Sequence, residues 1–113
     1  MKDEVKAILF HIQDAINGIE LYFPDKKDFY DYKENRMRKK AIERELAIIG
    51  EAINRLKKLE SSIKIENANQ IISLRNFLVH SYEKVEDEII WGIIVYHLPK
   101  LKLEITKLFN EYT

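Results

Sequence analysis

Four polar side chains that can act on a phosphate group lie close together in one otherwise apolar segment. Residues 71–82 read Ile-Ile-Ser-Leu-Arg-Asn-Phe-Leu-Val-His-Ser-Tyr and contain Arg75, Asn76, His80 and Tyr82. A guanidinium can bind a phosphate through two parallel hydrogen bonds, and an imidazole that titrates near neutral pH can move a proton to or from a ribose oxygen. Arg75 and His80 are therefore candidates for phosphodiester chemistry that requires no metal.

The spacing of these residues limits how they can meet. On a helix that turns by ~100° per residue, Tyr82 returns to nearly the face of Arg75, whereas His80 lies about 140° away. Arg75 and His80 converge only if the helix ends near His80 or a second chain supplies the other partner. Spacing alone is a weak signal, because an Arg and a His on one helix more often form a surface ion pair and a helix cap. Tyr82 alone would be read as a helix-end tyrosine with a packed ring and a solvated hydroxyl.

Two helices are expected before this segment. Apolar residues at three- and four-residue steps predict a first helix from Val5 to Phe23, limited by Pro24. Residues 25–35 are predicted to form a loop or a short helical turn. A second helix carries apolar residues at a 3.5-residue rhythm typical of a bundle seam, and small residues beside that seam would let a neighbour approach closely. The seam residues are Ile42, Leu46, Ile49, Ile53 and Leu56, and the small residues are Ala47, Gly50 and Ala52.

The polar segment itself is expected to form the third helix. Asn67 followed by Gln70 resembles an N-cap with its capping-box partner, so this helix should begin there and run to about Tyr82. A last helix is expected from Ile90 to Leu108. Pro99 cannot donate a hydrogen bond to the carbonyl of Val95, which predicts a kink or break near residues 97–99.

Length and composition indicate one all-α domain. The chain has 113 residues, of which 46% are hydrophobic and 34% charged, with only three Gly and two Pro. This balance favours long amphipathic helices over the many tight turns of an all-β fold. We expect residues 1–113 to form a single up-and-down antiparallel bundle of four to five helices.

Charge and cysteine content restrict the environment and the partners. The absence of Cys, the hydrophilic start Met1-Lys2-Asp3-Glu4 and the lack of an apolar run near the ~20 residues of a membrane span predict a cytoplasmic protein. The 19 basic and 19 acidic side chains cancel. Any contact with RNA must therefore be local.

Other polar and aromatic residues carry weaker signals. A basic cluster at the start of the second helix could bind an RNA backbone, although such a cluster is more often a solvated face. Glu51, among small residues, could pair with Arg75 or a partner subunit, and a structural ion pair is the favoured interpretation. The basic cluster consists of Arg36, Arg38, Lys39, Lys40 and Arg44.

The remaining histidines and aromatic residues are assigned no chemistry. His11 and His97 stand alone without metal-ligand spacing, so neither a metal nor another cofactor is expected. Trp91, Tyr96 and Phe109 on the last helix could reach either the bundle core or a dimer interface.

Three segments resemble one known family. The run from Arg75 to Tyr82 looks like the Arg-x4-His-x-Tyr signature of HepT-like toxins in the HEPN superfamily, including the Asn after the Arg. Ile49-Gly50-Glu51-Ala52 resembles a segment of that family's preceding helix. Residues 85–91 together with Leu98-Pro99-x-Leu101 resemble its final helix.

The resemblance implies a homodimeric, metal-independent endoribonuclease. Two copies of Arg75 and His80 would share one cleft, where the ribose 2′-OH attacks the adjacent phosphate and leaves a 2′,3′-cyclic end. His80 would act as general base or acid, Arg75 would stabilise the charged phosphorane, and Asn76 would orient His80 or the phosphate.

The resemblance also implies regulation through Tyr82. HepT-like toxins are typically encoded with an MNT-type nucleotidyltransferase antitoxin, which silences them by adenylylating the motif tyrosine. An adenylyl group on Tyr82 would place bulk and negative charge beside Arg75. The sequence leaves two rivals open: a non-catalytic nucleotide- or substrate-binding partner of a minimal nucleotidyltransferase, and a purely structural dimerisation domain.

Overall fold

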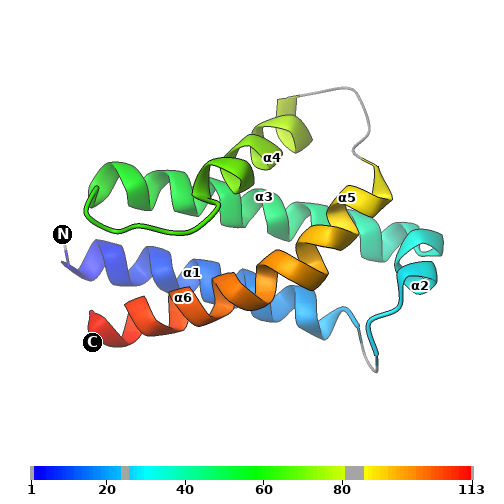
Figure 1. The fold of residues 1–113 in the computed structure, drawn as a ribbon, viewed down its shortest axis with the longest axis horizontal. Coiled ribbons are helices and arrows are strands. Elements are labelled where there is room, and N and C mark those ends of the chain that lie inside the picture. The colour runs from blue at the N-terminus through cyan, green and yellow to red at the C-terminus, as the bar shows by residue number, and fades with distance from the viewer. Residues whose placement is uncertain (1, 24–25, 81–85, 113) are drawn as a thin grey trace.

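The computed structural model describes residues 2–23, 26–80 and 86–112, and these ranges contain helices and no strand (Figure 1). The predicted all-α fold is confirmed. In chain order the elements are α1 (Lys2–Leu21), α2 (Phe29–Glu34), α3 (Arg36–Leu59), α4 (Ala68–His80), α5 (Asp87–Gly92), the π-helical turn η1 (Ile93–His97) and α6 (Leu98–Glu111).

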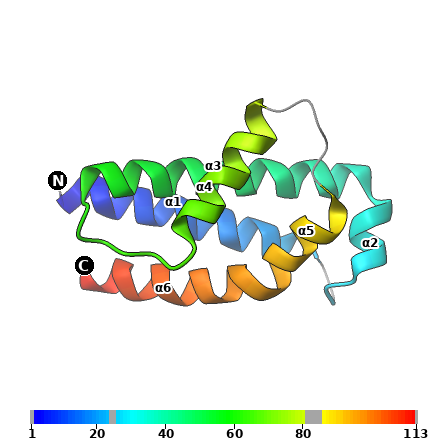
Figure 2. The ribbon, with the colours of Figure 1, turned by 45° about the horizontal axis from the view of Figure 1, so that its top comes forward.

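Three long helices form the body of the bundle. α1 packs against both α3 and α6, and it runs antiparallel to each of them (Figure 1). α4 packs on α3 and crosses it at a steep angle, so that the C-terminal end of α4 projects away from the bundle (Figure 2). The helix that carries Arg75, Asn76 and His80, α4, is therefore attached to the rest of the fold mainly through α3.

The core lies along the predicted apolar faces. All seven periodic residues predicted for the first helix, Val5, Ile8, Ile12, Ala15, Ile16, Ile19 and Phe23, are buried. The five seam residues of α3 are buried as well, and so are five of the last helix, Ile90, Ile94, Leu98, Leu101 and Ile105. Because each stripe faces the same interior, burial of apolar area holds the three long helices together.

The ends of α2 are set by short polar side chains. Asp28 is the N-cap of α2, and its carboxylate accepts hydrogen bonds from the backbone N–H groups of Tyr30 and Asp31. Asn35 ends α2 and begins α3, where its Oδ1 accepts from the Arg38 N–H at 2.9 Å. The segment predicted as a loop or short turn is thus largely the helix α2.

The helix is not broken near residues 97–99 as the sequence suggested, but it widens into the π-helical turn η1 just before Pro99. The N–H of Leu98 donates to the carbonyl of Ile93, five residues earlier, and Pro99 lies in the first turn of α6. Pro99 has no N–H, so the helical hydrogen bond that this position would donate to the preceding turn is not made. The chain is therefore helical on both sides of this turn.

The start of α4 differs from the predicted capping box. The carbonyl of Asn67 accepts the first helical hydrogen bond from Ile71, as an N-cap does. However, Asn67 adopts a left-handed φ of 64°, and its side-chain nitrogen lies 3.5 Å from Nδ1 of His97. Asn tolerates this backbone region better than most residues. Its side chain therefore contacts the π-helical turn. The predicted extension of this helix to Tyr82 falls outside the described residues.

The aromatic residues of the last helix differ in how far their side chains are exposed. Trp91 contacts Phe23, Phe29 and Tyr32 at ring-centroid distances of 5.7, 5.7 and 5.8 Å, so it packs, partly buried, against the core. Phe109 is partly buried against the core, whereas Tyr96 is exposed. Among the described residues, no helix is long and apolar enough to cross a membrane.

Candidate functional site

Arg75 lies where α4 crosses α3, and Gly50 makes this crossing possible. A methyl group on Gly50 would collide with the Cβ of Arg75 and would stand 3.0 Å from the carbonyl oxygen of Ile71. Only a residue without a side chain lets the two helices approach this closely. The close approach of a neighbouring helix that the small residues predicted is therefore observed at Gly50. This contact fixes where the Arg75 side chain leaves α4.

The guanidinium of Arg75 is held between two acceptors. One terminal nitrogen lies 3.6 Å from a carboxylate oxygen of Glu51, and the other donates to Oδ1 of Asn76 at 3.0 Å. The Arg75 side chain is 25% exposed and that of Glu51 is 61% exposed. The ion pair with Glu51 was one of the two pairings expected from the sequence, whereas the contact of Asn76 with Arg75 was not expected.

These contacts leave the guanidinium able to accept a phosphate. A separation of 3.6 Å is too long for a hydrogen bond, so Glu51 attracts Arg75 through charge without saturating its donors. The Nε of Arg75 is buried and has no hydrogen-bond partner among the described residues, so a phosphate would have to bind the terminal nitrogens of this 25% exposed side chain. Because α4 carries no Asp or Glu, its own side chains would not repel a phosphate that approaches Arg75.

The structure describes less of the other two motif residues, His80 and Tyr82. His80 is the last described residue of α4, five positions after Arg75, and its side chain lies outside what the structure describes. That separation corresponds to about 140° around an ideal helix and ~7.5 Å along it. Tyr82 also lies outside the described residues.

The basic cluster at the start of α3 divides into two groups. Lys39 forms an ion pair of 2.9 Å with Asp87, and each of these side chains is only 12% exposed. Arg38 is partly buried with its guanidinium 5.4 Å from the centre of the Phe23 ring. The other three, Arg36, Lys40 and Arg44, are exposed and recur every four residues along one face of α3.

The two remaining histidines have ordinary surroundings. His11 is exposed beside the ring of Phe10, and His97 contacts Asn67. Within the described ranges, no three side chains of the metal-binding types gather closely enough to hold an ion.

A cavity that the sequence did not predict lies next to α4. It has a volume of about 460 Å³, is open to solvent, and is bordered by the end of α3, the connection between α3 and α4, and the first turn of α4. The sequence shows this connection only as a stretch without helical periodicity. The alternating Ile63 and Ile65 were the available signal, because apolar residues in a polar connection must lie against something.

Comparison with known proteins assigns the chain to a family. The model of the family described as "Ribonuclease HepT-like" matches residues 12–108, a range that includes Arg75, Asn76, His80 and Tyr82. The chain belongs to the HepT-like ribonuclease family. No solved structure matches it.

Several curated proteins are similar to the chain along most of its length. "Putative RNase MJ1380" of Methanocaldococcus jannaschii is 32% identical over 106 residues, which cover 92% of this chain and 95% of that protein. "Gamma-glutamylcyclotransferase and putative RNase MJ0434" of the same organism is 33% identical over 98% of this chain but only half of its own length. "Putative RNase TTE0752" of Caldanaerobacter subterraneus is 31% identical over 74% of this chain and 75% of its own.

Proposed function

We propose that this chain is a metal-independent endoribonuclease and the toxin of a HEPN/MNT toxin–antitoxin pair. The observation that carries the proposal is the seating of Arg75, a family-motif residue whose partly exposed guanidinium is fixed by Gly50, Glu51 and Asn76. Membership of the HepT-like ribonuclease family supports the assignment of RNA as substrate.

The proposed reaction is transfer of the phosphate to its own ribose. An imidazole of His80 removes the proton of the 2′-OH, the 2′-oxygen attacks the phosphorus, and the bond to the 5′-oxygen of the next nucleotide breaks. An acid returns a proton to that leaving oxygen, so the products are a 2′,3′-cyclic phosphate and a 5′-hydroxyl. Arg75 stabilises the charge that develops on the phosphorane, and Asn76 keeps the guanidinium oriented.

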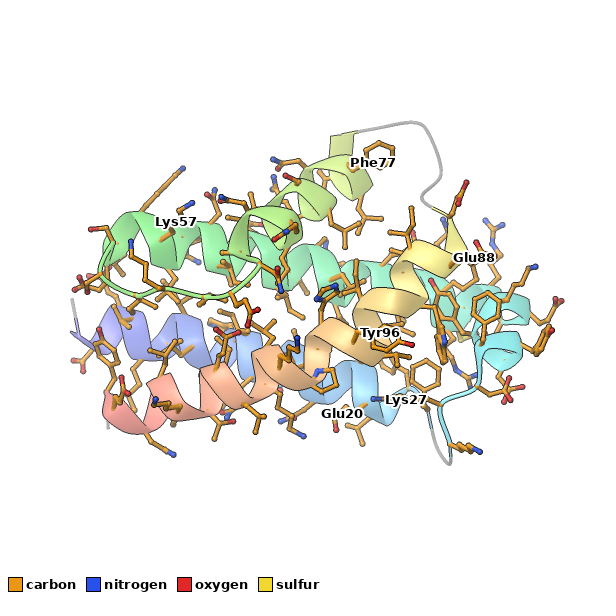
Figure 3. The ribbon with its side chains drawn as sticks, viewed as in Figure 1. Glu20, Lys27, Lys57, Phe77, Glu88 and Tyr96 are labelled. Carbon is orange, nitrogen blue, oxygen red and sulfur yellow. The ribbon has the colours of Figure 1, made fainter. Side chains whose placement is uncertain are left out.

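The site is proposed to form between two copies of the chain. On one helix, positions five residues apart diverge by about 140°, so Arg75 and His80 meet more readily across an interface than within one α4. The projecting end of α4 carries exposed apolar side chains, Phe77 at 40% and Val79 at 48%, and Phe77 points away from the bundle body (Figure 3). Burial of this end against a second copy would remove that apolar surface from water.

Regulation is proposed to act on Tyr82, two positions after His80. Adenylylation by an MNT-type nucleotidyltransferase would add a phosphodiester charge and an adenosine near Arg75. The added phosphate would then compete with the RNA phosphate for the same guanidinium.

The test is incubation of the purified protein with a mixed RNA pool in the presence of chelator, followed by end-group analysis of the fragments. We expect cleavage that leaves cyclic phosphate ends, lost in Arg75→Ala and His80→Ala. The matched controls are Lys107→Ala and His11→Ala, which change an exposed cation on α6 and an exposed histidine on α1 and should cleave normally.

Mixing the two inactive variants tests the shared cleft. A mixed dimer of Arg75→Ala and His80→Ala chains retains one intact Arg75 and one intact His80, so partial activity should return when the two proteins are co-refolded. Activity that never returns would contradict a site formed between copies. RNA left intact by unmodified, dimeric wild-type protein would contradict the ribonuclease itself and favour the non-catalytic partner of a nucleotidyltransferase.

A further inference from the structure

The cavity beside α4 has the composition of a site for an anionic ligand with an apolar part. Its floor is formed by the buried Ile53 and Leu56 together with Ile63 and Ile65 from the connection between α3 and α4. Lys57 and Lys64 stand at its edge, and no carboxylate belongs to its lining. A volume of about 460 Å³ lies within the range typical of small-ligand pockets.

The polar rim is already organised. Nζ of Lys57 donates to Oδ1 of Asn69 at 2.8 Å, a bond that joins the last turns of α3 to the first turn of α4. Lys57 lies on α3 above the connection that runs to α4 (Figure 3). An ammonium group has three donors, so two remain for a phosphate after the bond to Asn69. The amides of Asn69 and Gln70 add donors and acceptors that suit the edge of a base.

We propose that this cavity, here called the α3–α4 pocket, binds one nucleotide of the RNA that flanks the scissile phosphate. The proposal rests on the ribonuclease function proposed for Arg75 and His80. The base would lie against the aliphatic floor, and its phosphate would contact Lys57 and Lys64. Single-stranded RNA is generally recognised through such unstacked bases and their polar edges.

The position of the pocket fits a neighbouring nucleotide. Along α3, Lys57 lies seven residues beyond Gly50, a rise of ~10 Å, and along α4 Gln70 lies five residues before Arg75, a rise of ~7.5 Å. Both helices therefore place the pocket within a few nucleotides of the guanidinium. A second cavity of about 290 Å³ between α1 and α3 is lined by three carboxylates, Asp14, Glu45 and Glu51, against one arginine, Arg55, so its lining suits a polyanion less well.

The experiment measures binding without cleavage. The probe is a fluorescent five-nucleotide RNA with 2′-O-methyl riboses, which lacks the attacking hydroxyl, and its affinity for the full chain is followed by anisotropy over a range of salt concentrations. Lys57→Gln combined with Lys64→Gln should weaken binding by about tenfold or more. Each lost phosphate contact should make the salt dependence shallower by ~0.7 in log–log slope.

Two further variants make the result specific. Lys58→Gln combined with Lys107→Gln removes two exposed lysines that do not line the pocket, and its effect should be smaller. Ser61→Glu adds a carboxylate at an exposed position of the lining and should weaken binding without disturbing the core. With cleavable RNA, the Lys57/Lys64 variant should raise KM and leave kcat unchanged, because neither lysine contacts the scissile phosphate.

The outcomes separate this inference from the proposed function. Pocket variants that bind and cleave RNA like the Lys58/Lys107 control would overturn the inference and leave the ribonuclease in place. If the protein does not cleave RNA but its RNA binding still depends on Lys57 and Lys64, the pocket assignment holds and the proposed ribonuclease activity is wrong. If adenosine monophosphate binds the pocket as tightly as the oligonucleotide does, the pocket is a site for a free nucleotide and the RNA assignment is overturned.

Discussion

Gly50 of α3 and Arg75 of α4 occupy adjoining positions that leave no room for a Cβ on the glycine. We therefore expect Gly50→Ala to separate the two helices, because the added methyl group meets the Cβ of Arg75 and the backbone of Ile71. Overpacking of this kind typically costs about 1–3 kcal/mol of unfolding free energy. Urea unfolding would measure the loss, and RNA cleavage should fall as the guanidinium moves.

Gly92 supplies the matched control for this substitution. It is also a helical glycine, but a Cβ built on it meets no atom within 4 Å. Gly92→Ala should stabilise the protein by up to ~1 kcal/mol, because alanine has the higher helix propensity. Equal losses of stability in the two variants would contradict the close approach at Gly50.

Glu51→Gln tests the ion pair that orients Arg75. Because Glu51 is 61% exposed, the pair with Arg75 should contribute less than about 1 kcal/mol to stability. The expected effect is instead on catalysis: a several-fold decrease in kcat from a guanidinium that is less well oriented, with little change in the unfolding midpoint. Steady-state cleavage kinetics and urea unfolding would be measured on the same preparation.

A comparable ion pair far from Arg75 serves as the control. Lys102 and Glu20 are 2.8 Å apart, and both side chains are substantially exposed. Glu20→Gln should change stability as little as Glu51→Gln does and should leave kcat unaltered. If Glu51→Gln also leaves kcat unaltered, Glu51 has no part in positioning Arg75.

The sequence was sufficient for the helices because the burial of apolar side chains repeats with the helical period. The buried stripe from Val5 to Phe23 follows from local rules and is present, whereas the kink or break expected near Pro99 takes the form of a π-helical turn in a continuous helix. The close helix crossing at Gly50 could be predicted only in part. Its small size allows a close neighbour, but which side chain fills the space depends on how α4 crosses α3.

Features that depend on contacts between distant segments could not be predicted. The left-handed backbone of Asn67 accompanies a contact with His97, thirty residues later. Lys39 continues the seam spacing three residues before Ile42 and Lys40 does not, so the sequence indicates which lysine turns toward the bundle, but not that Asp87 is its partner there. The α3–α4 pocket exists because an aperiodic connection packs across the end of α3.

These adjacent lysines should respond in opposite ways to the same substitution. Lys39→Gln leaves the largely buried carboxylate of Asp87 without its cation, which should cost roughly 2–4 kcal/mol of stability. Lys40→Gln should leave stability within about 0.5 kcal/mol, because Lys40 is exposed. If Lys40 contacts the RNA backbone, its loss should also make the salt dependence of RNA binding shallower by ~0.7 in slope.

Urea unfolding and anisotropy titrations of both variants would decide this prediction. A Lys39 variant as stable as wild type would show that the ion pair with Asp87 contributes nothing to the fold. A Lys40 variant with an unchanged salt slope would remove this face of α3 from the proposed RNA contacts.

Tyr32 gives a prediction about stability at alkaline pH. Its side chain is fully buried, and its hydroxyl has no hydrogen-bond partner among the described residues. Burial raises the pKa of Tyr32, and the carboxylates of Glu43 and Asp87 raise it further. The unfolded chain loses the tyrosine proton near pH 10, whereas the folded protein keeps it, so rising pH favours the unfolded state. The contribution of the neutral Tyr32 side chain to the unfolding free energy is fully present below about pH 10 and is lost progressively as the pH rises above it.

Tyr32→Phe should therefore have two effects. It removes an unsatisfied buried hydroxyl, which should raise the unfolding free energy at pH 7 by about 1–2 kcal/mol, and it should reduce the loss of stability above pH 10. Tyr30→Phe is the control, because Tyr30 is 73% exposed and should show neither effect. The measurement is urea unfolding at pH 7 and at several values above pH 9. A Tyr32→Phe protein less stable than wild type at pH 7 would mean that the hydroxyl contributes a hydrogen bond to the folded state.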